Sequence, residues 1–201
     1  MVADLQARRN LVATTAYSFV AGWVDTLGYL ALGLFTTHVT GNFVLMFVGV
    51  NRTGELGKVL SIPVFVSIAA CCSLAVTWRG APGRGAVRAL QAAQAALLAA
   101  FMLAGAWVGA PQPGTSSLPL LVGMVGVAAM AVQNAVNRLG VPPGPSTTVM
   151  TVNLSQVAVD VARLARSPAD HTVRERLRLH LPAVVAFAIG CAGGAGGYAL
   201  A

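Results

Sequence analysis

Residues 11–35 read LVATTAYSFVAGWVDTLGYLALGLF, a long apolar run with one acid, Asp25, a little past its middle. A helix of about 20 apolar residues crosses the hydrocarbon core of a bilayer, so this run predicts a membrane-spanning helix. Four further segments meet the same criterion, at residues 60–78, 87–108, 118–139 and 179–200. We therefore predict an all-α fold, a polytopic transmembrane helix bundle that forms a single domain over residues 1–201.

The composition supports a membrane protein and excludes several other classes. The 201 residues are 56% hydrophobic and only 9% charged, with a mean hydropathy of +0.73, whereas a soluble domain carries roughly 25% charged residues. A soluble enzyme and a disordered chain are thereby excluded. The net charge of +7 would suit nucleic acid, but the basic residues lie between apolar runs. We therefore expect the lipid bilayer, and no nucleic acid, as a partner.

Two shorter apolar segments do not match a full span. Residues 43–50 reach only about 12 Å as a helix, and residues 149–162 are interrupted by polar side chains. Each follows a polar turn, TTHVTGN at 36–42 and STTVMTVN at 146–153. Because Thr and Asn are common N-cap residues, we expect each turn to begin a short helix. In the second of these helices the polar residues are spaced to lie on one face. We interpret this face as the polar side of an amphipathic helix leaving the membrane; it consists of Asn153, Gln156, Asp160 and Arg163.

The two halves of the chain share four landmarks in the same order. GWVD at residues 22–25 matches AVQN at 131–134, and THVTGN at 37–42 matches TVMTVN at 148–153. A proline follows in each half, Pro63 and Pro182, and a cysteine stands nine residues after each, Cys72 and Cys191. We expect two repeats of helix, broken helix and helix, repeat one over residues 11–78 and repeat two over 118–200, joined by a linker helix at 87–108.

The basic residues predict how these repeats are oriented. If both short segments dip into the membrane and return, 11 of the 13 Lys and Arg residues lie on the cytoplasmic side; if both cross, 9 do. Cytoplasmic loops carry the excess of basic residues, so the first arrangement is favoured. It places the N-terminus in the cytoplasm and makes the repeats inverted, an arrangement found in transporters. Parallel repeats are the alternative.

The quoted motifs resemble a known family. AGWVD at 21–25, THVTGN at 37–42, QN at 133–134 and TTVMTVN at 147–153 are similar to the bacterial YoaK family of multi-pass membrane proteins, which carry a domain of unknown function. The resemblance covers nearly the whole chain and implies a bacterial cell (inner) membrane location, without an established activity or substrate. The second Thr-Gly-Asn reads Thr151-Val152-Asn153 here, which puts in doubt that the second half packs or binds like the first.

Asp25 is the first candidate functional residue. An ionisable side chain at lipid depth is costly and usually faces a cavity or a partner, so we interpret Asp25 as a site for a proton, a cation or a substrate amine. Gln133 and Asn134 occupy the matching place in the second half and are neutral. The alternative is structural: an Asp25 bonded to neighbouring helices, and amides that join helices at about 0.6 kcal/mol per hydrogen bond.

The two polar turns are the second candidate. Broken backbone at lipid depth is tolerated where it is buried or lines water, and a helix that begins there aims its free N–H groups at the gap. We expect the turns to meet at the midplane around one substrate or ion site, with capping alone as the alternative. The candidate residues are Thr37, His38, Thr40, Gly41, Asn42, Thr148, Thr151 and Asn153.

These features favour a small-solute secondary transporter for an unknown solute or ion. A non-transporting scaffold or partner subunit, whose polar residues only pack helices, is the alternative. We expect no enzyme, because no nucleophile stands with a base, and no cofactor or metal, because the sequence has neither a CxxC nor a Cys/His ligand spacing. The Gly-rich segment 190–197 predicts tight helix packing, within the chain or in a homodimer.

Overall fold

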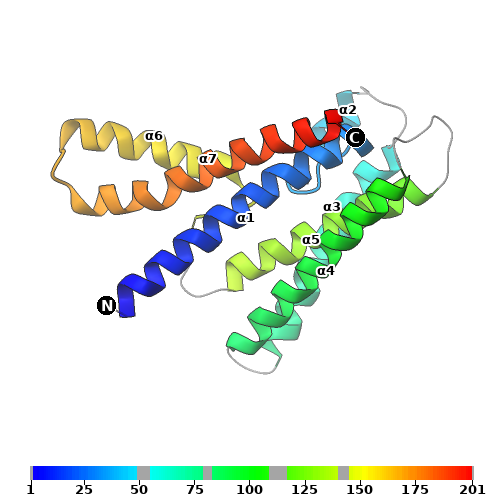
Figure 1. The fold of residues 1–201 in the computed structure, drawn as a ribbon, viewed down its shortest axis with the longest axis horizontal. Helices are drawn as coiled ribbons and strands as arrows, with labels where there is room; N and C mark the ends of the chain where they lie inside the picture. Colours follow the sequence, from blue (N-terminus) through cyan, green and yellow to red (C-terminus); the bar gives the residue numbers. More distant parts are fainter. Residues whose placement is uncertain (1, 49–54, 79–82, 109–116, 140–144, 201) are drawn as a thin grey trace.

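The computed structural model describes residues 2–48, 55–78, 83–108, 117–139 and 145–200, and within these ranges it contains helices and no strand. The predicted all-α fold is confirmed. The predicted short helix at 43–50 corresponds to α2, and its last two residues lie outside the described ranges. The helices are α1 Val2–Leu32, α2 Gly41–Val48, α3 Glu55–Thr77, α4 Arg84–Val108, α5 Leu118–Leu139, α6 Met150–Arg166 and α7 His171–Leu200 (Figure 1).

Four of these helices are long and apolar enough to cross a membrane: Leu56–Thr77 in α3, Gly85–Val108 in α4, Leu118–Leu139 in α5 and His171–Leu200 in α7. They correspond to four of the five predicted spans. α1, with 31 residues, is not among them, because polar side chains such as Ser18, Asp25 and Thr26 interrupt its apolar run. By these helices the chain is an integral membrane protein.

The end of α1 corrects the first predicted span. The helix stops at Leu32, before the predicted end at residue 35. Gly33 has a φ of 69°, the left-handed conformation that glycine adopts without strain, and its N–H donates to the carbonyl of Tyr29 at 2.9 Å. This is a common helix C-terminal motif, and it releases residues 34–40 from the helix as a turn beside α1.

The helices form two groups, joined mainly by the contact between α1 and α5. In the first bundle α1 and α6 pack on α7, and in the second bundle α3 and α4 pack on α5, with α2 on α3. Figure 1 shows α1, α4 and α7 running in one direction and α3 and α5 in the opposite one. Residues 33–40 therefore lead the chain from the first bundle into the second, and residues 145–149 lead into α6 of the first.

Glycines bring α1 and α7 together, in the most extensive of the helix contacts. A Cβ on Gly22 would collide with the carbonyl oxygen of Phe187, and a Cβ on Gly190 would collide with that of Phe19. Gly194 lies against the carbonyl of Trp23 in the same way. The Gly-rich segment of α7 is thus used within the chain, as small residues in membrane helices allow.

α6 corrects a second prediction. Its polar residues Asn153 and Asp160 are buried and α6 packs on α7, whereas Leu154 and Val161 on the other face are 57% and 52% exposed. The polar face therefore makes the helix contact, and an apolar face points outward, which suits lipid. The N-cap residue is Val149, without a side-chain hydrogen bond, so the predicted capping of this helix by Thr or Asn is wrong.

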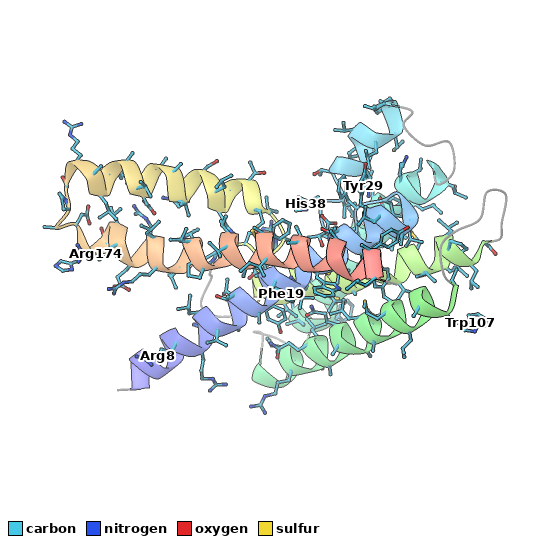
Figure 2. The ribbon with its side chains drawn as sticks, turned by 45° about the horizontal axis from the view of Figure 1, so that its top comes forward. Arg8, Phe19, Tyr29, His38, Trp107 and Arg174 are labelled. Carbon is cyan, nitrogen blue, oxygen red and sulfur yellow. The ribbon has the colours of Figure 1, made fainter. Side chains whose placement is uncertain are left out.

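Arginines mark one end of the molecule. Figure 2 shows Arg8 and Arg174 at one end and Trp107 at the opposite end. The α6–α7 hairpin and the start of α1 extend beyond the other helices at the arginine end (Figure 1). Trp107, at the end of α4, and Trp78, just after α3, are 81% and 86% exposed, as expected of tryptophans near a membrane–water interface.

Candidate functional site

Asp25 lies in α1 with only 4% of its surface exposed, and the chain folds back over it. We call residues 33–42, which make this fold, the acid turn. The backbone N–H of Thr37 donates to Asp25 Oδ1 at 2.7 Å, and the Thr36 hydroxyl approaches the same oxygen at 3.4 Å. Thr37 also donates its hydroxyl to the carbonyl of Ala21 at 3.3 Å. The carboxylate is therefore held by donors from its own turn.

His38 occupies the second oxygen of this carboxylate. Its Nδ1 lies 2.6 Å from Asp25 Oδ2, and the ring packs edge-on against Phe187 of α7, with the centroids 5.4 Å apart. The His38 side chain is 32% exposed, against 6% for Asp25. The imidazole thus connects a buried carboxylate with the surface of the bundle, a connection that sequence spacing alone did not predict.

Asn42 holds the acid turn closed. Its side-chain oxygen accepts the N–H of Phe35 at 2.8 Å, while its amide nitrogen donates to the Phe35 carbonyl and to Ser61 of α3, each at 2.8 Å. The N–H groups of Gly41, Asn42 and Phe43 donate to the carbonyls of the three preceding turn residues. Because these N–H groups are already bonded, the expected role of the α2 N-terminus as an open site for a ligand is not supported.

A second cluster surrounds Gln133 of α5, which is fully buried. Its amide nitrogen donates to the Thr147 hydroxyl at 3.2 Å and to the carbonyl of Tyr17 at 3.0 Å, and its oxygen accepts Gln94 at 2.7 Å. Asn134, one residue on, donates to the Thr148 hydroxyl at 2.8 Å. We call residues 145–153, which carry these threonines, the amide turn.

Asn153 closes the amide turn as Asn42 closes the acid turn. Its amide nitrogen donates to the carbonyl of Ser146, seven residues earlier, at 2.5 Å, and Asn42 likewise bonds Phe35, seven residues earlier. The Ser146 hydroxyl accepts the N–H of Val149 at 3.0 Å. In both turns, paired threonines contact the preceding helix and a buried asparagine fixes the loop.

Three predicted site residues do not join these clusters as expected. Thr40 and Thr151 are exposed, and Thr151 lies on the outer side of α6, beside Val152 and Ser155 in a shallow hollow. Gly41 packs against the ring of Phe35 and contributes backbone only. Thr40 and Thr151, which match in the two halves, are thus both exposed, and both lie outside the hydrogen-bonded clusters.

The two clusters converge on the middle of α1. Gln133, in the cluster of the amide turn, donates to the Tyr17 carbonyl, and Thr37 of the acid turn donates to the Ala21 carbonyl. These carbonyls are one helical turn apart, roughly 6 Å along the axis. A carboxylate–imidazole pair and a group of neutral amides are therefore neighbours inside the bundle.

Several residues of the site were not predicted. Gln94 of α4 bonds Gln133, and Gln91 donates to the Tyr17 hydroxyl at 2.8 Å. Two buried oxygens in the described chain, Ser18 Oγ and Gln94 Oε1, lack a hydrogen-bond partner. The signal was available, because Gln91 and Gln94 interrupt an otherwise apolar span, and polar residues at that depth seek partners.

The α6–α7 hairpin contains a separate polar group. Arg176 donates to Asp160 at 2.8 Å, and its guanidinium holds the pKa of this buried carboxyl below the usual value. Asp170, just before α7, accepts the Thr172 hydroxyl and the Val173 N–H, which lower its pKa. These contacts fix the hairpin.

Two shallow hollows on the described surface do not include Asp25 in their lining. One is the hollow on α6 next to Thr151, and the other is an apolar groove between α1 and α4, lined by residues such as Trp23 and Leu98. Within the described ranges, His, Cys, Asp and Glu side chains do not gather in a group of three. The chemistry of the site is that of hydrogen bonds and one carboxylate–imidazole pair.

Comparison with known proteins gives a family and no activity. No curated protein and no solved structure matches the chain. The motifs had indicated a multi-pass membrane family of unknown function. Membership of the YoaK family in particular stays a prediction. The profile that does match covers residues 13–200, and by it the chain belongs to the family described as protein of unknown function, DUF1275.

Proposed function

We propose that the protein is a secondary transporter for a small solute, with its site between the acid turn and the amide turn. The observation that carries this proposal is the convergence of the two clusters on adjacent carbonyls of α1, Tyr17 and Ala21. Polar groups and broken helices at lipid depth are expensive and serve transport paths in many membrane proteins. Here they gather from both halves of the chain at one place.

The division into two bundles supports a mechanism. The first helix of each proposed repeat packs on the last helix of the other, α1 on α7 and α5 on α3. The acid turn leads from one bundle to the other, and the amide turn leads back. Rocking of one bundle against the other about these turns would open the site to alternate sides, as inverted-repeat transporters do.

The proposal includes a bacterial inner membrane location with the N-terminus in the cytoplasm. Support comes from the arginine end of the molecule, where α1 begins, α4 begins, α5 ends and the α6–α7 hairpin turns (Figure 1). The exposed arginines on these segments are Arg8, Arg9, Arg88, Arg138, Arg163, Arg166, Arg174 and Arg178. A basic end of this kind faces the cytoplasm.

The experiment is a thermal-shift screen of small solutes against the purified protein in detergent, comparing wild type with Asp25→Asn. A ligand that binds only the native fold raises its melting temperature. We expect one class of small polar solutes to stabilise wild type and not the variant, and to accumulate in proteoliposomes. If no solute is taken up in proteoliposomes, the transporter proposal fails.

A non-transporting membrane subunit is the second candidate, and one observation favours it. Apart from Thr40 and Thr151, the polar side chains of both turns have partners within the chain, and Asp25 lines neither the hollow on α6 nor the groove between α1 and α4. In that case the clusters only join helices. Asp25→Asn would then lower stability without changing the response to any solute.

A further inference from the structure

We infer that the Asp25–His38 pair is a proton-binding site, so that the proton is the coupling ion of the proposed transporter. This inference rests on the proposed function for its role in transport, but the binding itself does not depend on a solute. It is carried by the geometry around the carboxylate and by the difference in exposure between its two members.

The surroundings of Asp25 select a proton over a metal cation. Thr37 N–H and His38 Nδ1 approach its two oxygens at 2.7 and 2.6 Å, so both oxygens face nitrogen atoms. A hard cation needs a shell of oxygen ligands, whereas the groups closest to both carboxylate oxygens are nitrogens. A proton needs no such shell, because it binds the free nitrogen of the imidazole.

The step balances as follows. With His38 neutral, Nδ1–H donates to the ionised Asp25, and the pair carries one negative charge. Hydronium gives its proton to Nε2, water leaves, and the pair becomes an imidazolium–carboxylate with no net charge. A net charge at lipid depth is costly, and the imidazolium–carboxylate ion pair carries none. The 32% exposure of the His38 side chain gives the proton a way in, while Asp25 stays buried.

The described side chains that contact the acid turn do not include another acid. α7 presents Phe187 to His38 and the thiol-bearing Cys191 next to Gly22, and α5 approaches Thr36 with Gly126. Asn42 and Ser61 connect the acid turn to the backbone of Lys58 in α3, a buried cation with a partner of its own. The carboxylates Asp160 and Asp170 belong to the α6–α7 hairpin.

The test uses proteoliposomes of the full-length protein on a solid-supported membrane, with a rapid pH jump and no solute present. Binding of a proton inside the membrane moves charge, so wild type should give a transient current. Asp25→Asn and His38→Asn should lose it. The asparagine at position 38 can still donate to Asp25 but takes up no proton, so this variant keeps the acid if Asp25→Asn fails to fold.

Asp170→Asn is the matched control, because it also removes one carboxyl group, but from the connection before α7; its current should equal that of wild type. A sodium jump at constant pH should give no current. The inference is overturned if wild type gives no pH-jump current, if both site variants keep it, or if a sodium current appears that Asp25→Asn removes. A solute-induced current without a pH-jump current would keep the transporter and remove the proton site; the reverse would keep the proton site alone.

Discussion

The acid turn and the amide turn have the same construction and different chemistry. In each, threonines contact the preceding helix and a buried asparagine bonds a backbone carbonyl seven residues earlier. His38 of the acid turn bonds a carboxylate on the preceding helix, Asp25, whereas the matching residues of the second half are Val149 in the amide turn and Asn134 on α5. The comparison shows that the asparagine and threonine side chains hold both turns in shape. The Asp25 carboxylate has no counterpart at the matching position of the second half.

The largest effect on this comparison is expected when the carboxyl group is transferred from position 25 to the matching position 134. The double variant Asp25→Asn with Asn134→Asp should fold, because Asn134 Oδ1 already accepts from Arg138 Nε at 3.0 Å and the Thr148 hydroxyl can donate. We expect the pH-jump current to stay absent, since the amide turn has no imidazole beside position 134. A restored current would show that the two turns are interchangeable.

The asparagines that close the turns should differ in their contribution to stability. Asn42 makes three hydrogen bonds and Asn153 makes one to an oxygen. At about 0.6 kcal/mol per bond in membranes, Asn42→Ala should lower the free energy of unfolding by about 2 kcal/mol and Asn153→Ala by about 0.6 kcal/mol. Unfolding of both variants in mixed micelles measures this. Equal losses would mean that these side-chain hydrogen bonds do not set the stability of the turns.

A substitution next to the amide turn should be nearly neutral. Gln94→Leu removes the donor to Gln133 but also removes the buried Gln94 Oε1, which has no partner. The two effects oppose each other, so we expect the free energy of unfolding to change by less than about 0.6 kcal/mol. The same micelle titration measures it, and a loss as large as that of Asn42→Ala would contradict this reading of the cluster.

The smallest effect lies outside both turns, at Asp170. Its pKa is lowered by the Thr172 hydroxyl and the Val173 N–H, so its charge stabilises the folded state above the ordinary pKa of about 3.9. This contribution is lost as pH falls through the lowered pKa. Relative to Asp170→Asn, wild type should lose a small part of its stability on acidification, measured by melting temperature between about pH 6 and pH 2. A constant difference across this range would exclude the effect.

Hydropathy predicted the spans of α3, α4, α5 and α7 well, because crossing a bilayer depends on an additive, local property of the chain. The first span was placed too far toward residue 35, since the helix ends through the left-handed conformation of Gly33, which the other glycines in the described residues do not adopt. The outward face of α6 was also predicted wrongly. A polar stripe turns toward water in a soluble setting, but here α7 supplies Arg176 to its buried acid.

The candidate site was predicted in its members more than in its contacts. Asp25, Thr37, Gln133 and Thr148 were selected as polar groups at lipid depth, and each is buried. The sequence could not show that His38 binds Asp25, that Thr40 and Thr151 lie outside, or that Gln94 and Tyr17 join the amides. These contacts depend on which helices pack together, and spacing along one helix carries no information about that.

By itself, the amino-acid sequence determined that this is a helical membrane protein with one acid and several amides at lipid depth, because the cost of transferring each side chain into lipid is a property of the residue. Only the tertiary structure decided which groups satisfy one another. Packing of α5 against α1 brings Gln133 to the carbonyl of Tyr17, one helical turn from the Ala21 carbonyl that Thr37 of the acid turn bonds. Hydrogen bonds require distance and direction in space, and these are fixed when the helices pack.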